Sequence, residues 1–102
     1  MATDKLKVML SFMREINDGN LPKAEDYGLD GEEYGSIIEA CQGEGLIKSA
    51  IIQRAGQGNK VIFIMLDQVK LTVKGMEYLH NNSKLMKTYK GIKEIKDWIP
   101  FI

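Results

Sequence analysis

The sequence predicts an α+β fold, because the spacing of its apolar residues changes twice along the chain. Up to residue 45, apolar residues recur at intervals of three and four, the pattern of one helix face. Between residues 46 and 71 they alternate and are rich in Ile and Val, as in strands. After residue 71 the helical spacing returns. At 102 residues, the chain is expected to form a single domain over residues 1–102.

Three helices are expected before residue 46. The first covers about residues 3–18, and its apolar residues share one face: Leu6, Met9, Leu10, Met13 and Ile16. Pro22 can open a short helix over residues 23–27, because proline suits the first helical position. The third helix begins at Asp30 with a capping-box arrangement, Asp30-Gly31-Glu32-Glu33, and ends at Gly43 and Gly45. Its inner stripe is expected to contain Tyr34, Ile37, Ile38 and Cys41.

A β-hairpin and two helices follow. Residues 46–53 and 61–71 are the expected strands, and the polar, glycine-bearing residues 54–60 form the tip between them. Thr72 is a suitable N-cap for a fourth helix that fades at about residue 82. A fifth helix over residues 83–99 would stop before Pro100.

This element order is that of a winged-helix domain with two additional C-terminal helices. The helix-turn-helix would occupy about residues 20–45, and the hairpin that forms the wing about residues 46–71. The additional helices would cover about residues 72–82 and 83–99.

Two segments resemble known proteins. Residues 71–79 (LTVKGMEYL) are similar to a motif that follows the wing in many bacterial winged-helix proteins. Residues 89–99 (YKGIKEIKDWI) resemble the C-terminal helix of the YjcQ family, small bacterial and prophage proteins of unknown function, and the resemblance extends from Lys5 to Trp98. It implies a winged-helix-like fold and a phage or prophage origin, and it provides no catalytic residues to carry over.

The distribution of charge argues against DNA reading by the third helix. The formal net charge is zero, but residues 1–47 sum to −6 and residues 48–102 to +6. The third helix, which would enter the major groove, contains no Lys or Arg and five acids: Asp30, Glu32, Glu33, Glu39 and Glu44. Although Tyr34, Ser36 and Gln42 could touch bases, these carboxylates would repel the phosphates.

We therefore expect a small non-enzymatic binding module that takes a protein partner or a second copy of itself. The candidate protein-contact residues are Glu32, Glu33, Glu39, Met86, Trp98 and Phe101. The alternative is a winged-helix DNA-binding transcriptional regulator that uses the wing and the C-terminal lysines. Its candidate phosphate contacts are Lys48, Arg54, Lys60, Lys87, Lys90 and Lys93.

No motif points to catalytic residues, a cofactor, a metal or a small-molecule substrate. One cysteine and one histidine, Cys41 and His80, cannot supply the four ligands of a structural zinc site. Cys41 is expected to be a buried thiol, and His80 to lie at the end of the fourth helix. The Gly56-Gln57-Gly58 segment lacks the lysine of a phosphate-binding loop, so it is interpreted as the wing turn.

The expected location is the cytoplasm. A lone cysteine cannot form an internal disulfide, which favours a reducing compartment. The longest uninterrupted apolar run, Val61–Leu66, has six residues, so no membrane contact is expected.

Overall fold

The structure, a computed structural model, describes residues 2–82, and the helix expected at residues 83–99 lies outside this range. Within it the fold is α+β, as the sequence predicts. The helices are α1 (Ala2–Asn17), the 3-10 helix η1 (Ala24–Tyr27), α2 (Gly31–Gly43) and α3 (Val73–Asn81). The strands are β1 (Ile47–Lys48), β2 (Ile51–Ala55), β3 (Lys60–Met65) and β4 (Lys70–Leu71). The expected order of the helices up to residue 82, with strands between the third and the fourth, is therefore confirmed, and the helix bounds are shifted by one or two residues.

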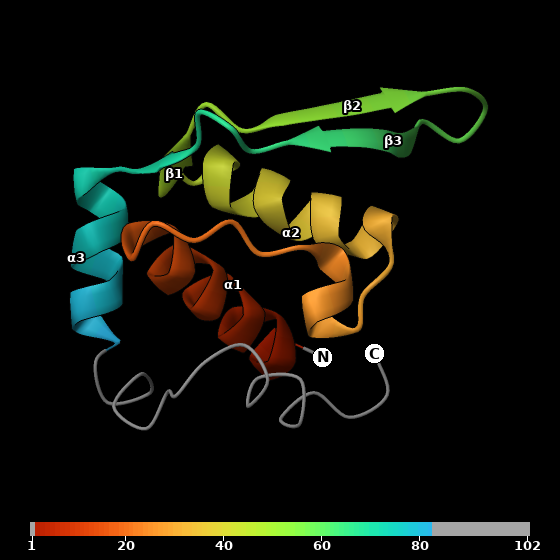
Figure 1. Cartoon of the computed structure of the whole chain (residues 1–102). Helices are drawn as coiled ribbons and strands as arrows, with labels where there is room; N and C mark the ends of the chain where they lie inside the picture. The colour runs from red at the N-terminus through yellow and green to blue at the C-terminus, as the bar shows by residue number, and fades with distance from the viewer. Residues whose placement is uncertain (1, 83–102) are drawn as a thin grey trace.

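The elements are stacked in layers around α2. The hairpin of β2 and β3 lies along one side of α2, and α1 crosses its other side (Figure 1). α3 stands at the end where β1 and β4 pair (Figure 1). α2 is therefore the central helix, and the hairpin lies along it.

The core lies between α1 and α2. The largest fully buried hydrophobic side chains come from α1, η1, α2 and β1: Val8, Leu10, Phe12, Met13, Tyr27, Ile38, Cys41 and Ile47. Phe12 of α1 meets Tyr34 of α2 edge-to-face, with ring centroids 5.9 Å apart. The whole predicted inner stripe of α2 is buried, which confirms the helical spacing as a guide to the core.

The strands are shorter than the sequence predicts. Each expected strand is broken, so β1 pairs with β4 and β2 pairs with β3 in two separate antiparallel ladders. Ser49, between β1 and β2, has φ 68°, a left-handed conformation that ends a strand. The Gln42 side chain then bonds the backbone of Ala50 in place of a strand, with Ala50 N donating to Oε1 at 2.8 Å and Nε2 donating to Ala50 O at 3.0 Å. The second expected strand is broken by a turn in which Val69 N donates to Leu66 O at 3.1 Å. The prediction of uninterrupted strands is wrong, because alternation of side chains reveals neither the positive φ of Ser49 nor this turn.

The motif at residues 71–79 forms a joint between the end of α2 and the start of α3. Thr72 caps α3, since its Oγ1 accepts from Gly75 N at 3.0 Å. The same hydroxyl lies 2.6 Å from Gly45 O and 3.0 Å from Leu46 O, while Thr72 N donates to Leu46 O at 3.0 Å. A Cβ on Gly75 would overlap Leu46 O and lie 2.8 Å from Leu71 Cδ1. The threonine and glycine of the motif are thus explained by packing of the backbone.

Candidate functional site

Arg54 of β2 joins the hairpin to the acidic face of α2. Its Nε donates to Glu39 Oε2 at 3.0 Å and its Nη2 to Glu39 Oε1 at 2.6 Å, which is a bidentate pair. Its Nη1 donates to Glu32 Oε2 at 2.8 Å. The other oxygen of Glu32 accepts from the backbone N–H of Val61 on β3 at 2.9 Å. The two carboxylates therefore hold both strands of the hairpin.

Two further contacts complete the Arg54 cluster, which we define as Arg54, Glu32, Glu39, Ser36 and Asn59. Nη2 donates to Ser36 Oγ at 3.3 Å, and Nη1 donates to the carbonyl of Asn59 at the hairpin tip at 2.9 Å. Glu32, Ser36 and Glu39 are four and three residues apart, so they share one face of the helix. The guanidinium side chain retains only 20% of its exposure.

The cluster shifts the titration of its members. The hydrogen bond from Val61 N, followed by that from Arg54, lowers the pKa of Glu32. The hydrogen bond from Arg54 lowers the pKa of Glu39. The hydrogen bonds to Glu39 and then Glu32 raise the pKa of Arg54. All three groups are therefore held in their charged forms, as expected for ion pairs that fix the hairpin to α2.

The Arg54 cluster unites residues that the sequence analysis assigned to different surfaces. Arg54 is a candidate phosphate contact, whereas Glu32 and Glu39 are candidate protein contacts. In the structure these charges face one another. The capping interpretation is confirmed for Asp30, whose Oδ1 accepts from Glu33 N at 2.8 Å, but it does not account for Glu32.

The polar residues of α2 that could touch bases also have partners within the fold. Tyr34 is buried, and its hydroxyl donates to Pro22 O at 2.6 Å. Gln42 is bonded to Ala50, and Ser36 accepts from Arg54. None of these three side chains is therefore without a partner in the fold.

The remaining candidates are dispersed. Glu33 is exposed in the first turn of α2. Lys48 is exposed on β1, opposite Lys70 of β4, and Lys60 is exposed at the start of β3 beside the hairpin tip. The other candidates lie outside the described residues: Met86, Lys87, Lys90, Lys93, Trp98 and Phe101.

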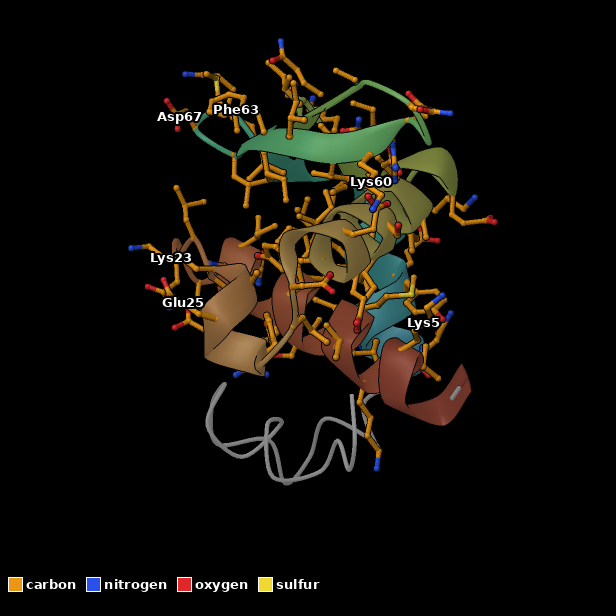
Figure 2. The ribbon with its side chains drawn as sticks, turned by 90° about the vertical axis from the view of Figure 1, so that its right-hand side faces the viewer. Lys5, Lys23, Glu25, Lys60, Phe63 and Asp67 are labelled. Carbon is orange, nitrogen blue, oxygen red and sulfur yellow. The ribbon has the colours of Figure 1, made fainter. Side chains whose placement is uncertain are left out.

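Exposed apolar side chains gather on the hairpin instead. Ile51, Ile62 and Phe63 are 46%, 64% and 46% exposed, and we call these three residues the hairpin patch. Phe63 lies on the side of the hairpin that faces away from α2 (Figure 2). The register shift between Gln53 and Arg54 leaves Ile62 without a partner on β2.

A groove lies between the hairpin and the connector that follows α1. It has a volume of about 280 Å³ and its lining is almost wholly apolar: Leu21, Pro22, Lys23, Ala24, Tyr34, Ile64 and Leu66. Lys23 and Glu25 lie below it, and Phe63 and Asp67 lie above, as Figure 2 shows. The sequence analysis missed this groove, because Leu21 belongs to no periodic segment and only the fold brings it near β3.

Metal-ligating side chains do not gather in residues 2–82. No set of three or more His, Cys, Asp or Glu side chains in this part of the chain could hold a metal ion. Burial raises the pKa of the Cys41 thiol to about 12, and His80 is exposed in the last turn of α3. None of the helices described here is both long and apolar enough to span a bilayer.

Comparison with known proteins identifies the family. A model of the YjcQ protein family matches residues 6–98. The uncharacterized protein YjcQ of Bacillus subtilis (strain 168) is 33% identical over 97 residues, which cover 94% of this chain and 98% of that protein. No solved structure matches the chain significantly. The family match over residues 6–98, together with the match to nearly the whole length of the Bacillus protein, shows that the chain belongs to the YjcQ family.

Proposed function

We propose that this protein is a small, non-enzymatic, protein-binding module with a winged-helix-like arrangement, in which the hairpin patch contacts the partner. The observation that carries the proposal is the exposure of Ile51, Ile62 and Phe63 on two adjacent strands. Exposed apolar side chains favour association, because burying them removes apolar area from water. Aromatic residues such as Phe63 are enriched at protein interfaces.

The Arg54 cluster supports a protein partner over DNA. A winged helix that binds DNA needs cations on the wing and a free face on its second helix. Here the wing arginine is bound by Glu32 and Glu39, so its charge is offset within the fold. Lys60 remains as the exposed cation on the described part of the hairpin. The order of α2 and the hairpin supports the winged-helix-like interpretation.

The proposal is tested by comparing proteins that co-purify with two variants of the full chain. Phe63→Lys places a charge in the hairpin patch, and Met76→Lys places the same charge on α3 at a residue of matched exposure, 51%. We expect a partner that is retained by the wild type and by Met76→Lys and is reduced at least tenfold by Phe63→Lys. Equal retention by both variants would overturn the proposal.

A binding measurement addresses the DNA alternative directly. Fluorescence anisotropy with a labelled random-sequence DNA duplex at low salt is expected to show no binding. Binding that falls steeply with salt, and that weakens in Lys60→Glu, would instead establish a nucleic-acid partner.

A further inference from the structure

The β2–β3 hairpin is joined to the rest of the described fold at one end only. Its strands start beside the end of α2 where β1 and β4 pair, and they run along α2 to an exposed tip (Figure 1). No residue of β2 or β3 is buried, and each is exposed or partly exposed. Segments with few buried apolar contacts open at a lower free energy than the core of the same domain. The hairpin is therefore expected to open more easily than the core between α1 and α2.

Two irregular segments at the base of the hairpin separate it from the β1–β4 ladder. On one chain Ser49 has φ 68°, and on the other Val69 N donates to Leu66 O in a turn. Both segments are anchored in the body of the fold, since Ala50, Leu66 and Val69 are buried. The Gln42 side chain also bonds both backbone groups of Ala50. The base and the β1–β4 ladder can thus stay in place while the hairpin beyond them changes position.

Beyond this base, a small apolar contact and the Arg54 cluster hold the hairpin against α2. Ile52 and Val61 lie against α2 but are only partly buried. The side chains of Glu32 and Glu39 are 45% and 38% exposed, so water competes for the ion pairs of the cluster. Ion pairs that remain this accessible to water contribute little stability each. The contacts between the hairpin and α2 therefore stabilise the closed position only modestly.

We propose that residues 51–65 form an arm that detaches from α2 while α1, α2, α3 and the β1–β4 ladder stay folded, and that the ion pairs of Arg54 hold this arm closed. Opening breaks those ion pairs and the hydrogen bond from Val61 N to Glu32, and it exposes the inner side chains Ile52 and Ile64. The open arm thus presents a second apolar face, which the closed structure partly covers. The inference goes beyond the proposed function, because the arm opens whether or not the hairpin patch binds a partner.

Residue-resolved amide hydrogen exchange of the full chain, at urea concentrations below the unfolding midpoint, tests the inference. A two-stranded hairpin alone is marginally stable in water, so the amides of the β2–β3 ladder exchange once the arm is detached. In the wild type we expect these amides to have similar protection factors, at least tenfold lower than those of residues 34–41 in α2. Their exchange should depend little on urea, because opening the arm exposes much less surface than global unfolding does.

Two arginine variants test the role of the ion pairs. Arg54→Gln removes the pairs of the cluster, and Arg14→Gln removes the surface pair between Arg14 and Asp18 on α1 as a matched control. We expect the protection of the ladder amides to fall about fivefold in Arg54→Gln and to stay unchanged in Arg14→Gln.

Two results would overturn the inference. The first is equal protection and equal urea dependence of the ladder and of α2 in the wild type, because the hairpin would then open only by global unfolding. This measurement needs no variant. The second is a ladder protection in Arg54→Gln that equals that of Arg14→Gln, since the cluster would not hold the arm closed. In either case a co-purified partner that depends on Phe63 would still support the proposed function, so the two failures are distinguishable.

Discussion

Replacement of Gly75 by alanine tests the joint between α2 and α3. At a helical position with free space around it, the change from glycine to alanine adds about 1 kcal/mol of stability, since alanine is the better helix former. Here the new methyl group would overlap Leu46 O, which already accepts a hydrogen bond from Thr72 N. Overpacking costs about 1–3 kcal/mol, and each weakened hydrogen bond costs about 1 kcal/mol more. We expect a net loss of roughly 1–3 kcal/mol in the free energy of unfolding.

The assay is urea denaturation followed by circular dichroism, with Gly43→Ala as the matched control. Gly43 is also helical, but an added Cβ there meets nothing within 4 Å. We expect the midpoint of Gly43→Ala to equal or exceed that of the wild type, and the midpoint of Gly75→Ala to fall with an unchanged slope. If Gly75→Ala were as stable as Gly43→Ala, the close contact with Leu46 would not constrain this position.

Three other outcomes are expected. Gly35→Ala should lose about 1–3 kcal/mol, because its Cβ would lie 2.8 Å from Val61 Cγ2, and adding Val61→Ala should recover part of the loss in the same denaturation assay. Arg54→Gln should destabilise the protein at neutral pH. Because the carboxylate pKa values are lowered in the folded state, the stability that they contribute is present above their unfolded pKa of about 4.3 and is lost as the pH falls through the folded values. The difference in midpoint between wild type and Arg54→Gln should therefore shrink in acid, and a constant difference would contradict the ion-pair explanation. Cys41 should resist a thiol reagent at pH 8 and become reactive only in urea at the unfolding midpoint, since its pKa is raised to about 12 in the fold; rapid labelling of the native protein would show that it is accessible.

Periodicity was sufficient to locate α1, α2 and α3 and the buried face of α2. The i, i+3, i+4 spacing of Tyr34, Ile37, Ile38 and Cys41 is a direct consequence of one buried face, and all four are buried. Caps were equally visible, because Asp30 and Thr72 bond backbone groups three residues away. Helix faces and N-caps are determined by residues a few positions apart, so they can be predicted from the sequence.

The contacts across the fold depend on distant residues, and no local pattern revealed them. Arg54 is 22 residues from Glu32 and 15 from Glu39, so its pairing requires the hairpin to lie along α2. A sequence clue exists in the spacing of the two glutamates by seven, which places them on one helix face. This spacing could not identify the cation with which the two glutamates form ion pairs. The groove is harder still, because Leu21 and Ile64 share no motif.

Because the hairpin is attached to α2 at Arg54, its two parts differ in how much sequence change they tolerate. The inner part is constrained on the α2 side, where Gly35 leaves room only for the side chain of Val61. Beyond Arg54, residues 56–58 are exposed, and both glycines among them have positive φ. Surface turns of this kind accept insertions at little thermodynamic cost. An insertion at residues 56–58 is therefore expected to leave the body of the fold undisturbed, and the same turn offers a place for a label or tag that leaves the groove and the hairpin patch intact.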